Sequence, residues 1–135
     1  MQTNTNIETP YDVAEFNRLI RNRRSVFPVQ FSGKTIEREI IEQILENANW
    51  APNHGKTEPW RFVVFTGEGL KQLAQFQSEL YKKITPEDKF EQRKFDKLAK
   101  KPLMASHVIA IGMCRAEGTK IPEIEDVEAV ACAVQ

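Results

Sequence analysis

Two short apolar segments, residues 61–66 and 108–113, carry the clearest β-strand signal in this chain of 135 residues. Both are rich in β-branched side chains, and Gly67 follows directly on the first of them. Most of the other apolar residues recur at the spacing of a helix. The chain is therefore expected to combine several helices with few strands, and two strands are few for a sheet that carries helices.

The first helix is predicted from a capping signature. Thr9 supplies an N-cap hydroxyl, Pro10 occupies N1 and Asp12 occupies N3, an order that satisfies unpaired backbone N–H groups. Apolar residues then recur at helical spacing and predict one buried stripe, which consists of Val13, Phe16, Leu19 and Ile20.

Further helices are expected around the two strands. Thr35 can cap a second helix, and a third is predicted over about residues 70–84. A fourth would open with the cap signature at residues 85–88 and run to about residue 100, and a last one would start at Pro122. The apolar face of the second helix would consist of Ile36, Ile40, Ile41, Ile44, Leu45 and Ala48.

The last helix keeps its apolar periodicity to Gln135. It shows no glycine cap, no lysine-rich last turn and no proline stop. Together with the small number of strands, this pattern predicts that the sequence is the N-terminal part of a longer protein.

Composition excludes several classes of function. Lys plus Arg equals Asp plus Glu at 19 each, so no net charge attracts nucleic acid or an anionic membrane. No apolar run approaches the roughly 20 residues that a membrane-spanning helix needs. Residues 1–8 are polar and are expected to be a flexible N-terminus without an export signal, followed by one domain over residues 9–135. The only two cysteines, Cys114 and Cys132, lack C-x-x-C or metal-ligand spacing, which indicates a reduced, cytoplasmic protein.

The stretch from Trp50 to Phe62 suits neither a helix nor a strand. Pro52, Gly55 and Pro59 interrupt it, and it carries Asn, His, Lys and Trp side chains. A loop made rigid in this way can present polar groups to a ligand. The alternative is a plain helix-to-strand connection with Trp60 in the core and a local turn at Asn53.

Arginine and serine residues follow the first helix directly. Arg23 and Arg24 could complement the negative end of that helix. With Ser25 they could instead bind a phosphate group, because guanidinium groups match phosphate oxygens in a bidentate manner. The residues alone leave both interpretations open.

From about residue 11 to residue 135, the chain resembles the nitroreductase family of flavin enzymes. The resemblance rests on Arg23-Arg24-Ser25, Ala51-Pro52-Asn53-His54, Glu58-Pro59-Trp60-Arg61-Phe62 and the final Glu128-x-x-x-Cys132-Ala133-Val134-Gln135. The Ala-Pro-x-His form is similar to that of a small bacterial subgroup of NAD(P)H nitroreductases. The resemblance implies an α+β fold with a central, mainly antiparallel sheet flanked by helices, incomplete here at the C-terminus. It also implies a homodimer with noncovalent FMN at the subunit interface.

Site residues follow from the resemblance one by one. Arg23, Arg24 and Ser25 match the positions that hold the FMN phosphate and ribityl chain. Trp50 and His54 match loop positions that reach the flavin bound mainly by the other subunit. Asn53 lies beside them, and its amide is expected to hydrogen-bond the ribityl chain or the ring edge.

The chain departs from the family pattern at Phe27. Many relatives place a lysine there, two residues after the serine, near the pyrimidine edge of the flavin. Without that lysine, the positive charge that would stabilise a reduced flavin must come from elsewhere, or the flavin potential differs. Family members also continue into a glycine-rich segment and a basic C-terminal stretch that complete the flavin site.

The resemblance implies an oxidoreductase that moves a hydride from NAD(P)H to flavin and then electrons to a nitroaromatic, quinone or similar acceptor, in a ping-pong cycle. The flavin carries the chemistry, so no side chain is assigned as an acid–base catalyst and no metal is expected. Two alternatives remain open at this point. One is a flavin-binding protein without turnover, and the other is an inactive fragment of a longer enzyme.

Overall fold

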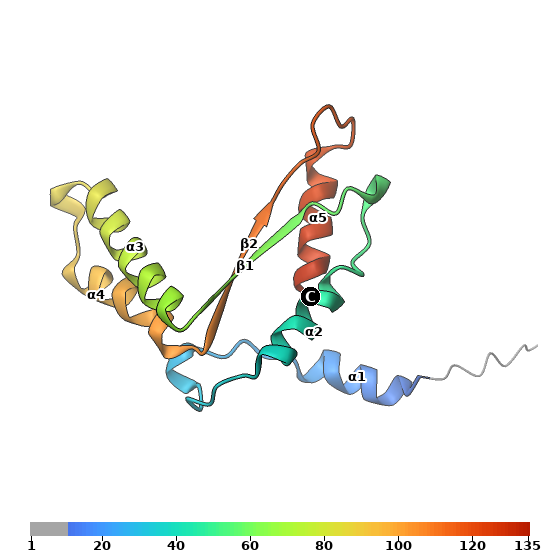
Figure 1. Cartoon of the computed structure of the whole chain (residues 1–135), viewed down its shortest axis with the longest axis horizontal. Helices are drawn as coiled ribbons and strands as arrows, with labels where there is room; N and C mark the ends of the chain where they lie inside the picture. Colours follow the sequence, from blue (N-terminus) through green and yellow to red (C-terminus); the bar gives the residue numbers. More distant parts are fainter. Residues whose placement is uncertain (1–10) are drawn as a thin grey trace, which may run out of the picture.

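The computed structural model describes residues 11–135 and shows an α+β chain (Figure 1). In chain order its elements are α1 (Val13–Asn22), α2 (Arg38–Ala48), β1 (Trp60–Thr66), α3 (Glu68–Ile84), α4 (Gln92–Lys100), β2 (His107–Met113) and α5 (Glu123–Val134). Short 3-10 turns occupy Pro28–Gln30, His54–Lys56, Glu87–Lys89 and Lys101–Met104. The predicted fold class is confirmed.

The two strands form one antiparallel ribbon. Trp60 pairs with Met113 at one end and Thr66 pairs with His107 at the other. The two strands are adjacent in space, and α3 and α4 lie between them in the sequence. Side chains along β1 mostly alternate between more and less exposed positions, as expected for a strand with one covered face. An apolar, β-branched run of this kind would suit a buried strand, but β1 is only partly covered, since Val63 is 54% exposed.

Helices gather at both ends of this ribbon (Figure 1). At one end α3 packs against α4, and Tyr81 stacks on Phe90 with ring centroids 5.5 Å apart. At the other end α2 and α5 close around Trp60, whose neighbours in the core are Ala48, Ala129 and Ala133. These small side chains leave room for the indole, and Trp60 is only 5% exposed. The predicted core role of Trp60 is confirmed.

Three helix starts differ from the sequence prediction. Asp12 lies outside α1 as its N-cap and accepts hydrogen bonds from the backbone N–H groups of Ala14 and Glu15, while Thr9 and Pro10 lie outside the described residues. The N-cap of α2 is Glu37 rather than Thr35. The signature at residues 85–88 produces only a 3-10 turn, and α4 begins at Gln92. A capping signature therefore marks a turn without fixing how far the helix extends beyond it.

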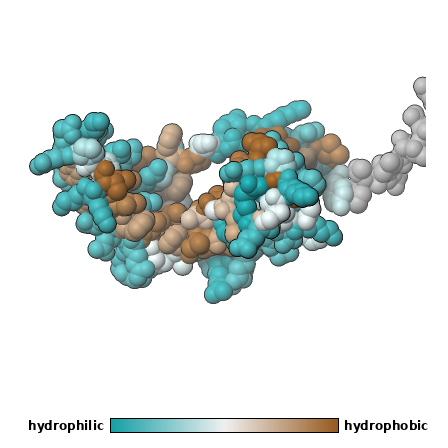
Figure 2. All heavy atoms as spheres, turned by 90° about the horizontal axis from the view of Figure 1, so that it is seen from above, coloured by the Kyte–Doolittle hydropathy of each residue, from teal (hydrophilic) through white to brown (hydrophobic). Residues whose placement is uncertain are grey.

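The predicted burial of the α1 stripe was wrong within the described residues. α1 contains no buried residue, and Phe16 and Leu19 are 62% and 63% exposed. The face predicted for α2 is also only partly covered: Ile41 and Ala48 are buried, whereas Ile40 and Ile44 are about half exposed. Figure 2 shows apolar side chains at the surface on one face of the molecule. Among the described residues, no helix has the length and hydropathy to span a membrane.

Candidate functional site

The loop between α2 and β1 is fixed at both ends. Trp60 Nε1 donates a 3.0 Å hydrogen bond to Oδ1 of Asn49, the C-cap of α2. At the other end, the backbone N–H of Cys114 donates to the carbonyl of Pro59 at 2.8 Å, which extends the pairing of the strands by one bond. The loop is thus a rigid connection, as its proline and glycine content predicts.

Asn53 closes the loop internally. Its Oδ1 accepts a 3.1 Å hydrogen bond from the backbone N–H of Glu58, and its Nδ2 donates to the carbonyl of Ala51 at 3.3 Å. The structure therefore shows the local turn that the residues allowed at Asn53. Contact of this amide with a flavin stays a prediction, and it would have to use the remaining Nδ2 proton or an oxygen lone pair.

The middle of the loop holds an unusual backbone. Gly55, Lys56 and Glu58 have φ angles of 64°, 54° and 43°, in the left-handed region. For Lys56 and Glu58 this conformation costs about 1–2 kcal/mol each, because the Cβ atom crowds the following carbonyl. Such strain persists only where the surroundings enforce it, and it is concentrated at functional sites.

His54 points from this loop to α5. Its Nδ1 lies 2.7 Å from Oε2 of Glu125, and the imidazole remains 63% exposed. A shallow hollow of about 300 Å³ lies between the two elements, lined by residues 52–54 and by Glu125, Glu128, Ala129 and Cys132. His54 is therefore oriented by a carboxylate while most of its side chain stays accessible.

Trp50 lies on the surface of the molecule. It is 82% exposed, although its backbone N–H still donates to the carbonyl of Asn47 at the end of α2. A large aromatic side chain held on an ordered turn can contact a ligand or a partner at little entropic cost. Its role beside a flavin of the other subunit stays a prediction.

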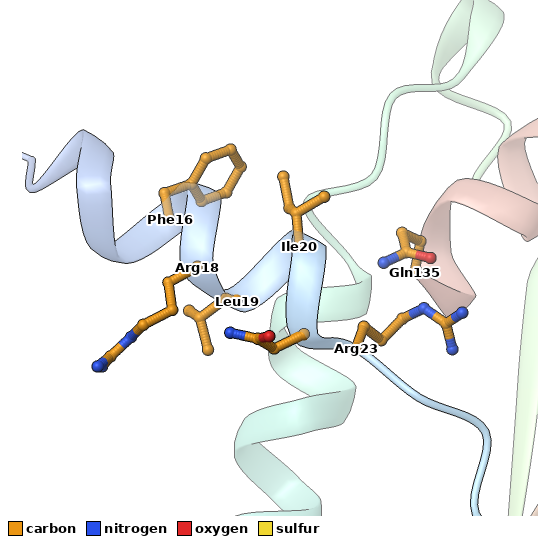
Figure 3. Close-up of a pocket in the computed structure, with 7 residues that line it drawn as sticks. Phe16, Arg18, Leu19, Ile20, Arg23 and Gln135 are labelled. Atoms are coloured by element: carbon orange, nitrogen blue, oxygen red, sulfur yellow. The ribbon is translucent and has the colours of Figure 1, made fainter.

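Arg23 and Arg24 follow α1 but make different contacts. Arg23 lines a hollow of about 560 Å³ with Phe16, Leu19 and Ile20 of α1 and Gln135 (Figure 3). Nη1 of Arg24 donates to the carbonyls of Arg21 and Arg23, at 2.8 and 2.9 Å. The helix-end role is thus visible for Arg24, whereas the Arg23 guanidinium forms no hydrogen bond or ion pair with the part of the chain described here.

The two groups of predicted site residues meet different parts of α5. Residues 52–54 face Glu125 to Cys132, and Arg23 faces Gln135 at its end. Within residues 11–135, no hydrogen bond or ion pair joins residues 23–25 to residues 50–54. Ser25 is exposed in the extended segment after α1. The fold therefore places the predicted groups along one helix without joining them directly.

Asp126 is a site residue that the sequence reasoning did not single out. It is 2% exposed, and its carboxylate accepts hydrogen bonds from Thr57 Oγ1 at 3.3 Å and Arg115 Nε at 3.0 Å. In the sequence it looks like one of several acids that favour a helix N-terminus. It shares a helix face with Ala129 and Ala133, but the burial of that face is seen only in the structure, so the sequence offered no signal for it.

Charge perturbation is visible elsewhere on the surface. A hydrogen bond to Glu42 raises the pKa of Arg38, and a hydrogen bond to Glu68 raises the pKa of Lys71. Both pairs are exposed and lie on helices α2 and α3, where ion pairs of this spacing stabilise the helix weakly. They bear on helix stability rather than on the loop.

Comparison with known proteins extends these observations. The model of the nitroreductase family matches residues 20–135. A Bacillus subtilis protein named "Putative NAD(P)H nitroreductase YfhC" is 37% identical over 70 residues, which cover 51% of this chain and 35% of that protein.

Two solved structures also match. A nitroreductase-like family protein from Bacillus cereus matches with a TM-score of 0.69 and 28% identity, over 94% of this chain and 63% of that one. An FMN-dependent nitroreductase from Clostridium difficile R20291 matches in fold, with a TM-score of 0.52 and 19% identity, over 88% of this chain and 54% of that one.

The chain spans about a third of the curated relative's length and less than two thirds of each matched structure. Within that span the family model covers most of the sequence, and the B. cereus likeness covers nearly all of it. The chain therefore belongs to the nitroreductase family.

Proposed function

We propose that this chain forms the flavin-binding part of an FMN-dependent oxidoreductase that takes reducing equivalents from NAD(P)H and passes them to a nitroaromatic, quinone or similar acceptor. Family membership supports this proposal, as does the NAD(P)H nitroreductase name of one relative. FMN, when bound, supplies the hydride and electron transfer. The chain supplies binding, orientation and electrostatics.

The observation that carries the proposal is the state of Arg23. Its guanidinium makes no ion pair with the described residues and lies at a hollow walled by apolar side chains of α1. A cation beside an apolar wall fits a ligand that combines a phosphate group with less polar parts, as FMN does. In this proposal Arg23 holds the phosphate. Arg24 supports Arg23 by donating hydrogen bonds to the backbone carbonyls at the end of α1.

The loop of residues 50–58 contributes the other part of the proposed site. Trp50 offers a flat, exposed aromatic surface, and His54 is oriented by Glu125. We propose that both contact flavin held mainly by a second copy of the chain, with Asn53 at its edge. This arrangement assigns no proton transfer to a side chain, so protons reach the acceptor from water.

A homodimer is part of the proposal. Phe16, Leu19 and Ile20 of α1 are each more than half exposed, and so are Ile124 and Val134 of α5. Apolar side chains grouped on one exposed helix face, as on α1, are typical of an interaction site. We propose that a second copy of the chain covers it.

The test is anaerobic reduction of the FMN complex. The chain is loaded with FMN, separated from free flavin and mixed with NADPH or NADH, while the visible absorbance of oxidised flavin is followed. The proposal predicts complete bleaching, followed by recovery of the absorbance when a quinone or nitroaromatic compound is added. FMN that stays bound but is not bleached by either nucleotide would contradict it and indicate a flavin-binding protein without turnover.

A further inference from the structure

We propose that Asp126 is a positioning residue that holds the loop of residues 53–58 and so sets the orientation of His54. The relevance of His54 to flavin rests on the function proposed above. The positioning itself rests only on contacts within this chain.

Asp126 stands out because it is both charged and nearly inaccessible. It is 2% exposed, and its two carboxylate oxygens accept from different partners. Oδ1 faces Thr57 Oγ1 in the loop at 3.3 Å, and Oδ2 faces Arg115 Nε, after β2, at 3.0 Å. The Asp126 carboxylate in α5 therefore joins the loop before β1 to the segment after β2.

The loop needs such an anchor because its backbone is strained. Lys56 and Glu58 flank Thr57 and both adopt positive φ angles. A residue in this conformation relaxes to an ordinary one unless its neighbours hold it. The hydroxyl of Thr57 lies between the two strained residues, 3.3 Å from Asp126 Oδ1 and 3.3 Å from the carbonyl oxygen of His54, so its one proton is shared between the buried carboxylate and the loop backbone. It is well placed to hold the strained residues.

Neighbouring contacts act in the same direction. Glu125 precedes Asp126 in α5 and pairs with His54, so adjacent residues of one helix turn bind both ends of the 3-10 turn. Arg115 also donates through Nη2 to the carbonyl of Ile121 at 2.5 Å. A Cβ added at Gly55 would lie 3.1 Å from Ile121 Cδ1, so this segment packs closely on the turn. His54 is thus oriented from α5 on a turn that Asp126 fixes.

Stability alone explains this network poorly. Removing the Asp126 carboxylate from water costs free energy that its pairing with Arg115, whose side chain is still 34% exposed, returns only in part, and apolar side chains at buried charged positions often stabilise a protein as well or better. What an apolar residue cannot supply is a directional contact to the Thr57 hydroxyl. The network therefore favours one loop geometry over other compact ones.

The experiment compares four variants of the full chain. Thr57→Val removes the hydroxyl while nearly keeping the shape of the side chain, whereas Thr57→Ser keeps a hydroxyl. Asp126→Asn removes the buried charge. Glu123→Gln is the matched control, because it changes one charge in the same helix turn, on an exposed residue 3.9 Å from the same Arg115. Amide hydrogen exchange of residues 53–58 is measured relative to β1, with melting temperature and FMN affinity measured in parallel.

The proposal predicts exchange in residues 53–58 about tenfold faster in Thr57→Val and Asp126→Asn, the size expected from the loss of one hydrogen bond to a charged group. Any change in the exchange of β1 should be no larger than the change in global stability explains. Thr57→Ser and Glu123→Gln should match the wild type. FMN affinity should fall in the first two variants and recover in Thr57→Ser.

Two results would overturn the inference. One is an amide exchange rate of residues 53–58 in Thr57→Val that equals the wild-type rate. The other is a faster exchange that is uniform over the whole chain and is explained by a lower melting temperature. The exchange measurement requires no flavin. Failure of the wild type to bind FMN would therefore count against the proposed function, while the exchange data still decide the role of Asp126.

Discussion

Trp60 Nε1 and Asn49 Oδ1 lie 3.0 Å apart and join the first residue of β1 to the C-cap of α2. The indole is 5% exposed, so this N–H has little access to water as an alternative acceptor. The hydrogen bond closes the loop that carries Trp50 and His54 across its base. The shape of the candidate site thus depends on a contact between residues eleven positions apart.

Replacing Asn49 should therefore destabilise the fold. Asn49→Ala leaves the buried indole N–H without its acceptor, which costs about 1–3 kcal/mol of unfolding free energy. Urea denaturation measures the loss. Asn47→Ala is the control, because Asn47 is exposed near the end of the same helix. Equal stabilities of the two variants would show that the Trp60 contact contributes nothing.

Gly55 is expected to be irreplaceable for two separable reasons. Its φ of 64° disfavours a side chain, and a Cβ would lie only 3.1 Å from Ile121. Gly33 has a φ of 75°, but a Cβ added there would meet nothing within 4 Å, so Gly33→Ala measures the backbone cost alone. That cost is about 1–2 kcal/mol. The loss of unfolding free energy in Gly55→Ala, measured by thermal or urea unfolding, should be larger than the loss in Gly33→Ala. Equal losses would argue against close packing of the loop on Ile121.

Local patterns predicted the helices and strands well. Apolar periodicity located α2, α3 and α5, and β-branched runs located both strands. The core position of Trp60 was predictable because an aromatic residue at a strand entry usually packs inside. These features depend on neighbours in the sequence, and the sequence contains that information.

Features that depend on distant segments were not predictable. The stripe of α1 has the periodicity of a buried face, yet Phe16 is 62% exposed because no described element covers it. Asp126 looks like a helix-start acid, and only the approach of Thr57 and Arg115 shows that it is buried and paired. The different contacts of Arg23 and Arg24 likewise depend on the three-dimensional fold, since both residues follow α1 directly in the sequence.

Phe27 offers a test of the proposed flavin position. It is 70% exposed and stands where the family resemblance leads us to expect lysine. If the flavin lies beside it, Phe27→Lys should stabilise the reduced, anionic flavin. We expect a rise in midpoint potential of roughly 30 mV, which corresponds to ~1.4 kcal/mol for a two-electron couple. Val29→Lys, on a side chain that is 76% exposed, is the control. An unchanged potential, or the same rise in both variants, would place the flavin elsewhere.

The apolar stripe of α1 should govern self-association. Phe16→Glu places a charge on this stripe without disturbing a packed core, because α1 has no buried residue. We expect the variant to keep its helical circular dichroism and to lose the dimer in analytical ultracentrifugation. Ala14→Glu adds the same charge on another face of the helix and should leave the dimer intact. A Phe16→Glu variant that dimerises like the wild type would exclude α1 from the interface.

Titration of the chain with FMN tests the central claim most directly. Quenching of flavin fluorescence gives the dissociation constant for the wild type, Arg23→Ala and Arg18→Ala. Arg18 lines the same hollow but pairs with Glu15 at 2.6 Å, so it controls for loss of positive charge. We predict saturable binding by the wild type, an affinity lower by about ten- to a hundredfold in Arg23→Ala, and little change in Arg18→Ala. No binding by the wild type, or equal affinity in Arg23→Ala, would contradict the assignment of Arg23 as the phosphate ligand of a flavin site.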